Sequence, residues 1–365
     1  MRMTPPIHRT TGIGKRGPLP LKRMRISDWV RREIALGRFL PGDRIPDRRW
    51  FLHRFKAANL PLVQQAFADL EREGFVVSAS RRGTCVAERL PFAGRYLLLV
   101  KDGDGDGGAN FFTPSLRAAA KALAEERGIR FEVMNLTDAR PGEAAYGKMI
   151  EEVRRQHYAG VVVQHLHKGH GLDTVTNLDD VPMVFFGLPS EYSQGNRVRS
   201  FDDGCQIHPR VFRLQCEDCA SQGLRRIAAF IPHINPLYAR PDEFSRLAAE
   251  AGLGIVANGL QTVDISHWNL DQFRRLAALF AASDAGREAK AVVLMDENML
   301  APFAEVCGSR YRIFCHCNAP ILPKSSLPVR FHGVDCTATL ASALDYMDAV
   351  RTGSRTPSSP RIFFV

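Results

Sequence analysis

Long apolar runs are missing from this sequence: none approaches the roughly eighteen residues that a membrane-spanning helix needs. The N-terminal stretch, residues 1–22, is basic and rich in proline, and it lacks the apolar core of a secretory signal. The eight cysteines are scattered and form no pair of C-x-x-C motifs, which argues against a disulfide framework and a paired zinc site. We therefore expect a cytoplasmic protein with free thiols and no membrane partner.

Acidic residues are scarce in the first quarter of the chain. Residues 1–90 hold 19 Lys and Arg against 8 Asp and Glu, a net charge of +11, whereas the whole chain carries +10. The remainder is therefore almost neutral, at −1. A basic head on a neutral body is typical of a protein that binds a polyanion, although a basic surface without a partner is the alternative. We predict a disordered basic arm over 1–22, a head over 23–90 and a body over 91–365.

The stretch from Asn59 to Gly74 carries the signals of a complete helix. Asn59 can cap the first turn, Pro61 suits an early helical position, and Gly74 can end the helix. One face is apolar at helical spacing, through Val63, Ala66, Phe67 and Leu70. The opposite face bears Gln65 and Arg72, with Gln64 at its edge, and Gln can pair with adenine in the major groove. Taken alone, the stretch also fits an ordinary amphipathic surface helix.

The segments around this helix extend the pattern. The predicted elements are, in order, a helix over 25–37, a turn-rich connector over 39–46, a helix from Pro46, the helix just described, and short strands over 75–77 and 84–87. Arg81 and Arg82 fall at the tip between the two strands. The order helix, helix, turn, helix, hairpin predicts a winged helix-turn-helix.

Several spaced motifs occur here in the order of one family. The chain resembles the GntR-type DNA-binding domain in Gly37-Arg-Phe-Leu-Pro-Gly-Asp-Arg-Ile-Pro46, Arg49, Glu73-Gly74-Phe75 and Arg82-Gly-Thr84. The resemblance implies that Arg49 contacts a phosphate. Where the family usually shows Ser-Arg-x-Thr-Val-Arg, this chain has Asn59-Leu-Pro-Leu-Val-Gln64, so two of the usual arginine contacts are absent.

We predict DNA contacts in which arginines hold phosphates and glutamines read bases. The predicted set is Arg48, Arg49, Asn59, Gln64, Gln65, Arg81 and Arg82. A helix-turn-helix dimer binds two half-sites about one helical turn apart. We therefore expect a homodimer on a pseudo-palindromic, double-stranded operator.

From residue 95 onward, strand and helix patterns alternate. Strands are predicted over 96–100, 131–135, 160–163, 181–186, 226–231, 291–295 and 311–315, and helices over 114–127, 146–157, 208–222, 242–251 and 299–307. Such alternation indicates βα units on parallel sheets, and the length suggests two lobes with a cleft between them. The predicted fold class is α/β: an N-terminal winged helix-turn-helix followed by a two-lobed domain with parallel sheets.

This body resembles the periplasmic-binding-protein-like effector domain of LacI-type repressors. The resemblance rests on Asp179-Asp-Val-Pro-Met-Val184, Val198-Arg-Ser-Phe-Asp202, Gln222-Gly-Leu-Arg-Arg-Ile-Ala228, Arg240 with Phe244, and Val292-Val-Leu-Met-Asp296. It implies an effector cleft lined by Arg240 and Asp296, and we add Asp202 and His165 to the predicted effector site. Glu243 stands where the family's motif has Gly. The alternatives are a surface salt bridge for Arg240 and a helix N-cap for Asp296.

Two other groups of residues suggest different chemistry. Gly103-Asp-Gly-Asp-Gly-Gly108 fits a dinucleotide-binding motif, but no helix follows at once and its two aspartates would repel phosphate. Metal-binding side chains follow two predicted strands, namely His165, His167, His170, Cys315 and Cys317.

We conclude from the sequence that the chain is a ligand-responsive transcription regulator. The resemblance implies a repressor of carbohydrate-utilisation genes that binds a sugar and is not an enzyme, with no cofactor and no metal. A metal-responsive regulator and a nucleotide-dependent α/β enzyme with a regulatory DNA-binding head are the alternatives.

Overall fold

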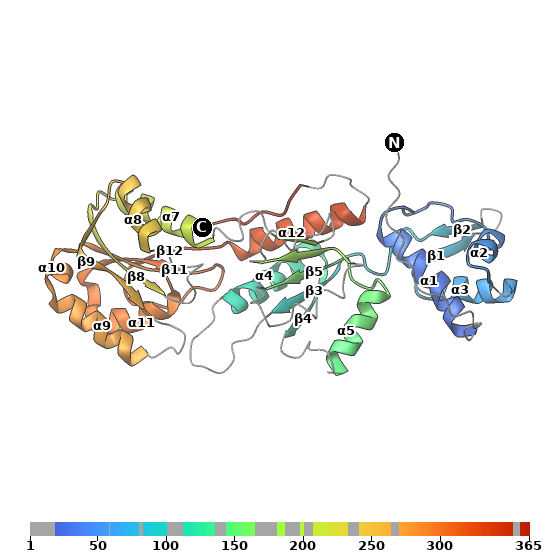
Figure 1. The fold of residues 1–365 in the computed structure, drawn as a ribbon, viewed down its shortest axis with the longest axis horizontal. Helices are drawn as coiled ribbons and strands as arrows, with labels where there is room; N and C mark the ends of the chain where they lie inside the picture. The colour runs from blue at the N-terminus through green and yellow to red at the C-terminus, as the bar shows by residue number, and fades with distance from the viewer. Residues whose placement is uncertain are drawn as a thin grey trace. The chain divides into compact units, whose positions relative to one another are not determined.

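The protein is described by a computed structural model (Figure 1). The described residues are 19–57, 59–79, 83–100, 112–135, 144–164, 181–186, 198–200, 207–232, 241–263, 270–352 and 358–365. The chain divides into two compact units, Met1–Pro91 and Phe92–Val365. Among the described residues, no helix combines the length and the apolar character that a membrane crossing requires.

The N-terminal unit is a three-helix domain with a small antiparallel hairpin. Its elements are α1 (Leu19–Ala35), α2 (Arg48–Arg54), α3 (Leu60–Arg72), β1 (Val76–Ala79) and β2 (Gly83–Val86). This is the predicted winged helix-turn-helix. Helix α1 begins before the expected residue 25, because Pro20 is tolerated in a first turn, and so takes in the end of the stretch assigned to the disordered arm. Helix α2 begins after Asp47, which caps it by accepting a hydrogen bond from the Trp50 backbone N at 2.9 Å, and not at Pro46 as predicted.

The predicted connector between α1 and α2 also joins the hairpin. The backbone N of Ile45 donates to the Thr84 carbonyl at 2.9 Å, and the backbone N of Val86 donates to the Asp43 carbonyl at 2.9 Å. Gly42 has a φ of +85°, a conformation that favours glycine. The connector therefore fixes strand β2 against the helices.

Aromatic rings fill the space between the three helices. The Trp29 ring lies 5.7 Å from Phe51 and 5.8 Å from Phe55, and Phe51 packs edge-on against Phe67 of α3 at 5.0 Å. Phe51 is fully buried. These rings anchor α2 and α3 to α1, which holds the helix-turn-helix in a fixed geometry.

The second unit contains two five-stranded parallel sheets. The first has the order β4-β3-β5-β6-β7 and the second has the order β12-β11-β10-β8-β9. The strands of the first sheet are β3 (Arg95–Val100), β4 (Arg130–Asn135), β5 (Gly160–Val163), β6 (Met183–Phe185) and β7 (Val198–Ser200). The strands of the second are β8 (Arg226–Pro232), β9 (Gly254–Val263), β10 (Ala291–Leu294), β11 (Arg312–His316) and β12 (Val329–His332). The predicted α/β class with parallel sheets is confirmed.

Helices cover both faces of each sheet (Figure 1). Helix α5 (Ala144–Arg154) packs on one face of the first sheet, and α4 (Phe112–Arg127) lies with α12 (Cys336–Arg351) on the other. On the second sheet, one face holds α7 (Ile207–Ser221) and α8 (Pro241–Glu250), and the other holds α9 (Leu270–Ala282), α10 (Asp284–Glu288) and α11 (Leu300–Cys307). Short 3-10 turns, η3 (Glu297–Met299) and η4 (Gly308–Arg310), flank α11.

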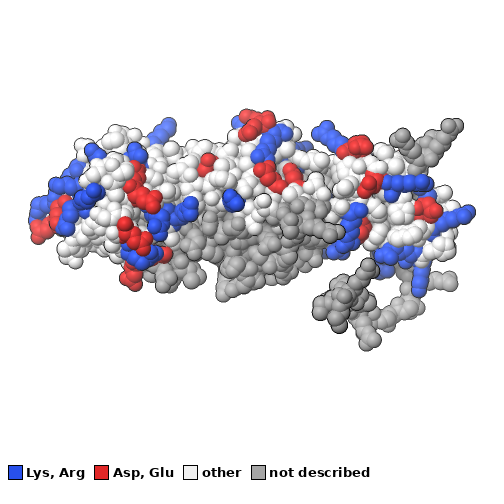
Figure 2. Space-filling model, turned by 90° about the horizontal axis from the view of Figure 1, so that it is seen from above, with Lys and Arg blue, Asp and Glu red and all other residues white. Residues whose placement is uncertain are grey.

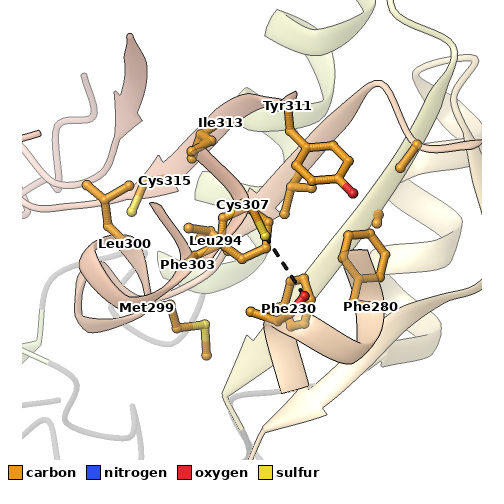
Figure 3. Packing of buried hydrophobic residues seen from close by; sticks show 14 of the residues in the cluster. Phe230, Phe280, Leu294, Met299, Leu300, Phe303, Cys307, Tyr311, Ile313 and Cys315 are labelled. Atoms are coloured by element: carbon orange, nitrogen blue, oxygen red, sulfur yellow. Dashed lines mark hydrogen bonds between the residues drawn. The ribbon is translucent and has the colours of Figure 1, made fainter. Parts of the chain in front are cut away.

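An apolar core holds the second sheet against the helices on one of its faces. In Figure 3 the rings of Phe230, Phe280 and Phe303 gather between the sheet and helices α9 and α11, with the Cys315 thiol in the same cluster. The Phe230 ring lies 5.3 Å from Phe280 and 5.6 Å from Phe303. All four side chains are nearly or fully buried, so the cluster packs α9 and α11 closely against this face of the second sheet.

Helix α12 follows a strand of the second sheet but packs against the first. Arg351 donates to the carbonyls of Tyr158 at 2.7 Å and Ala159 at 2.9 Å, and Tyr96 donates from its hydroxyl to Asp348. A Cβ on Gly160 would stand 2.1 Å from the Met347 sulfur, so only glycine permits this contact. The two sheets are thus parts of one unit.

Backbone pairing near α12 adds a second link. The backbone N of Ala319 donates to the Val334 carbonyl at 3.0 Å, and Gly333 and Val365 exchange hydrogen bonds at 3.1 and 3.0 Å. Ser115 of α4 donates from its hydroxyl to the Asn318 carbonyl at 2.6 Å. Three chain segments therefore run side by side where the second sheet meets α4 and α12.

Candidate nucleic-acid interface and effector site

Helix α3 has the capping and the face that its sequence predicts. The Asn59 side-chain oxygen accepts from the Leu62 backbone N at 3.1 Å, and Gly74 takes a φ of +81° just past the helix. The apolar stripe is buried, with exposures of 0% for Val63, Ala66 and Leu70 and 2% for Phe67. Gln64 and Gln65 are exposed. The two amides are therefore available to a partner while the other face holds the helix in the domain.

Two ion pairs fix α3 against α1. Arg23 bonds to both carboxylate oxygens of Asp69, and Arg72 adds a bond at 2.7 Å. Arg31 forms two bonds of 2.8 Å with Glu73. Burial alone would raise the pKa of Asp69, but the hydrogen bonds and charges of the two arginines outweigh it, and the pKa is lowered. The carboxylate thus stays ionised and keeps α3 in register with α1.

The two adjacent arginines at the start of α2 differ in their surroundings. Arg48 donates to the Thr84 hydroxyl at 2.8 Å and its guanidinium lies 4.7 Å from the centre of the Phe67 ring. It therefore links the hairpin to α3. Arg49 is exposed, and no hydrogen bond or ion pair holds it within the described part of the chain. Of the two, Arg49 is the side chain free to meet a phosphate.

Lys56 is a further exposed cation of the N-terminal unit, and it was not among the predicted DNA contacts. It is exposed in the turn between α2 and α3, with a φ of +44° that non-glycine residues rarely adopt. Its place in the short turn three residues before the predicted cap at Asn59 was the available signal. Figure 2 shows Lys and Arg side chains spread over the N-terminal unit at the right of the view, between smaller patches of Asp and Glu.

Strand β1 of the hairpin is bonded to α3 near the tip, and the tip itself, residues 80–82, lies outside the described residues. The backbone N of Ser78 donates to the Glu71 carboxylate at 2.9 Å, and the Ser78 hydroxyl donates to it at 3.3 Å. Arg81 and Arg82 lie outside the described residues. Their predicted contacts with DNA stay predictions.

Asp296 stands at the carboxyl end of β10, in the middle of the second sheet. Strands β8 and β10 are neighbours, and the chain leaves β8 toward β9 on the other side, so the strand order reverses between β8 and β10. Ligands of open parallel sheets bind outside the carboxyl ends of the strands at such a point. The position predicted from the family motif is thus also the one that topology favours.

The surroundings of Asp296 are unusual for a carboxylate. One of its oxygens accepts from the backbone N and the side-chain N of Asn298, both at 2.9 Å, so the residue caps η3 as the alternative interpretation predicted. Burial raises the pKa of Asp296 to about 6, although these hydrogen bonds work in the opposite direction. No cation is paired with it in the described part of the chain. A partly buried carboxylate without a counter-charge is a candidate ligand-binding group.

The other predicted effector residues, Asp202, Arg240 and His165, lie outside the described residues. The corresponding point of the first sheet, after β5, carries Gln164. Its amide and the Thr113 hydroxyl of α4 lie 2.9 to 3.0 Å apart. Gln164 was not among the predicted site residues, because its pairing with a residue 51 positions away leaves no local signal in the sequence.

The cysteines of the metal-responsive alternative are buried and bonded to backbone carbonyls. The Cys315 thiol donates to the His316 carbonyl at 3.5 Å, and the Cys317 thiol donates to the Ile321 carbonyl at 3.4 Å. Burial raises the pKa of both thiols. The described residues contain no group of three metal-binding side chains. The histidines at 165, 167 and 170 lie outside the described residues.

Comparison with known proteins supports both parts of this description. Residues 22–86 match the family model of bacterial regulatory proteins of the gntR family. A comparison with curated protein sequences finds no match.

Two solved structures share the fold. The structure of a regulatory protein of LacI family from Chloroflexus aggregans has 13% sequence identity and a TM-score of 0.53, covering 75% of this chain and 95% of that chain. The complex of the transcriptional regulator CelR with cellobiose has 15% identity and a TM-score of 0.50, covering 84% of this chain and 89% of that chain. Residues 22–86 thus match the gntR family of bacterial regulatory proteins, and the body that follows shares its fold with a LacI-family regulatory protein and with CelR.

Proposed function

We propose that this regulator is a repressor of carbohydrate-utilisation genes that responds to a sugar. The observation that carries the proposal is the joining of two parts in one chain. One is a helix that exposes two amides from a helix-turn-helix head, and the other is a sheet whose switch point presents a carboxylate with no cation paired to it among the described residues. Neither arrangement alone would make a ligand-responsive repressor.

Helix α3 enters the major groove in this proposal. Gln64 and Gln65 read bases, and Asn59, at the cap, approaches the same groove. Arg49 holds a phosphate, and Arg81 and Arg82 do the same from the hairpin. Arg48 supports them by holding the hairpin against α3, and contacts DNA only through the donors that Thr84 leaves unused.

The effector binds in a cleft between the two lobes. Asp296 accepts hydrogen bonds from hydroxyl groups, and Arg240, Asp202 and His165 complete the site. A carbohydrate fits a carboxylate of this kind because its hydroxyls are donors, and a cellobiose complex is known for CelR, which shares the fold. Closure of the lobes on the ligand changes the spacing of two heads in a homodimer, and a coupling of about 1–3 kcal/mol shifts DNA affinity roughly 5- to 150-fold.

The test starts from selection of bound duplexes out of a random pool, at moderate salt, with the full chain. Expected is a pseudo-palindromic site whose affinity changes with one sugar of a panel. Arg49→Ala weakens binding to all duplexes and lowers the salt dependence, because a phosphate contact is lost. Arg287→Ala, which removes the same charge from an exposed helix of the body, leaves DNA binding unchanged. Retention of no specific duplex at moderate salt contradicts the proposal.

A further inference from the structure

From Leu60 to Leu70, the exposed positions of α3 carry no charge. Leu60, Pro61, Gln64, Gln65 and Ala68 are all exposed, and all are neutral. The sequence has no Lys or Arg from residue 57 to residue 71. Two carboxylates, Asp69 and Glu71, lie on the helix.

Both carboxylates of α3 already serve the fold. Asp69 is buried to 8% exposure and held by Arg23 and Arg72. Glu71 accepts two hydrogen bonds from Ser78 of the hairpin. Arg72, the first cation on the helix, lies in its last turn and is paired with Asp69.

The four bases differ in what they need from a protein. Guanine is read by Arg or Lys on O6 and N7, cytosine by Asp or Glu on N4, adenine by Asn or Gln on N6 and N7, and thymine by apolar contact with its methyl group. From Leu60 to Leu70, the exposed positions of α3 supply the partners of adenine and thymine and lack those of guanine and cytosine. Glu71 and Arg72 follow only in the last turn, where each is already bonded within the fold.

We propose that α3 reads A·T base pairs, with Gln64 and Gln65 on adenine and the apolar side chains of Leu60 and Ala68 on thymine methyl groups. This rests on the proposed function of α3 as the DNA-reading helix. Two exposed cations of the N-terminal unit lie outside α3, namely Arg49 in α2 and Lys56 in the turn before α3. In this proposal they hold phosphates. Charge positions the domain on the duplex, and neutral groups choose the sequence.

The test uses the full chain and the duplex with the highest enrichment from a random pool. Each adenine of a half-site is replaced in turn by 7-deazaadenine, which lacks the N7 acceptor, and each thymine by uracil, which lacks the methyl group. Expected is a loss of roughly 5- to 150-fold at one or two adenines, which corresponds to 1–3 kcal/mol of discrimination, and a smaller loss at neighbouring thymines. Replacement of guanine by 7-deazaguanine in the half-site leaves affinity unchanged.

Variants of the two glutamines tie the effect to α3. Gln64→Ala and Gln65→Ala each remove the 7-deazaadenine effect at one position, and Ala does not threaten the fold because both positions are exposed and Ala favours a helix. Gln64→Arg moves the preference at its position toward guanine. A half-site in which 7-deazaguanine weakens binding most, with unchanged preference in both alanine variants, overturns the A·T assignment. A pool with no enriched duplex is a different result, since it overturns the proposed function itself.

Discussion

Replacing Asp296 by asparagine tests whether burial of this charged carboxylate lowers the stability of the second unit. Asparagine keeps an oxygen that can accept from the backbone N of Asn298, and Asn caps a helix about as well as Asp. What it removes is the charge. We expect Asp296→Asn to raise the free energy of unfolding of the second unit at neutral pH.

The size of the effect follows from the pKa of Asp296, which burial raises from 3.8 to about 6. Each unit corresponds to about 1.4 kcal/mol, so the shift sets a ceiling of about 3 kcal/mol, and the partial exposure of the side chain reduces the expected gain to about 1–2 kcal/mol. Because the folded pKa is the higher one, wild-type stability falls as the pH rises from about 4 to about 6. The advantage of the variant is therefore small near pH 4 and reaches its full value above pH 6.

The measurement is differential scanning calorimetry of both proteins between pH 4 and pH 8, following the transition of the second unit. A gain of about 2 kcal/mol corresponds to a rise of about 4 °C in Tm. Asp335→Asn is the matched control, because Asp335 caps α12 by accepting from Thr337 and Ala338 at 3.0 and 2.9 Å. It is expected to change stability by less than about 0.5 kcal/mol. A loss of stability in Asp296→Asn, or a gain that does not grow with pH, would refute the reasoning.

Three further changes test other parts of the structure. Lys56→Gly relieves the positive φ in the turn before α3 and raises the free energy of unfolding of the N-terminal unit by about 1 kcal/mol in a urea titration; a decrease contradicts the strained turn. Gln215→Met removes a fully buried amide whose two polar atoms have no hydrogen-bond partner in the described part of the chain. We expect it to raise the Tm of the second unit by the equivalent of about 1–2 kcal/mol. A lower Tm shows that the amide of Gln215 forms hydrogen bonds in the folded protein. Asp69→Asn weakens the link to Arg23 and lowers the free energy of unfolding by about 1–2 kcal/mol at pH 7. Since the pKa of Asp69 is lowered in the fold, the stability that its carboxylate contributes is lost as the pH falls below about 4. A difference in stability between variant and wild type that does not depend on pH argues against this role of Asp69.

Local signals carried the sequence analysis furthest in α3. Its cap, its early proline, its buried stripe and its terminal glycine all lie within sixteen residues, and each acts on its immediate neighbours. The alternation of strands and helices was likewise visible, because the buried strands are continuous apolar runs such as Tyr96 to Val100.

Contacts between distant residues could not be predicted in this way. The bond from Arg48 to Thr84 spans 36 positions and changes what that arginine can do, while the neighbouring Arg49 has the same sequence signal and a different environment. Strand β9 was missed because its middle is polar and bends at Asn258 and Gly259, where a Cβ on the glycine would lie 2.3 Å from Val256. The crossing of α12 to the first sheet also leaves no local trace.

Sugar-responsive DNA binding is tested most directly by the affinity of the full chain for its enriched duplex, measured at fixed moderate salt with and without each sugar of a panel. We expect one carbohydrate to change the affinity roughly 5- to 150-fold, Asp296→Asn to abolish this change, and Asp335→Asn to preserve it. An affinity that is the same for random DNA, or that no sugar alters while the duplex is bound specifically, would contradict the central claim of a ligand-responsive regulator.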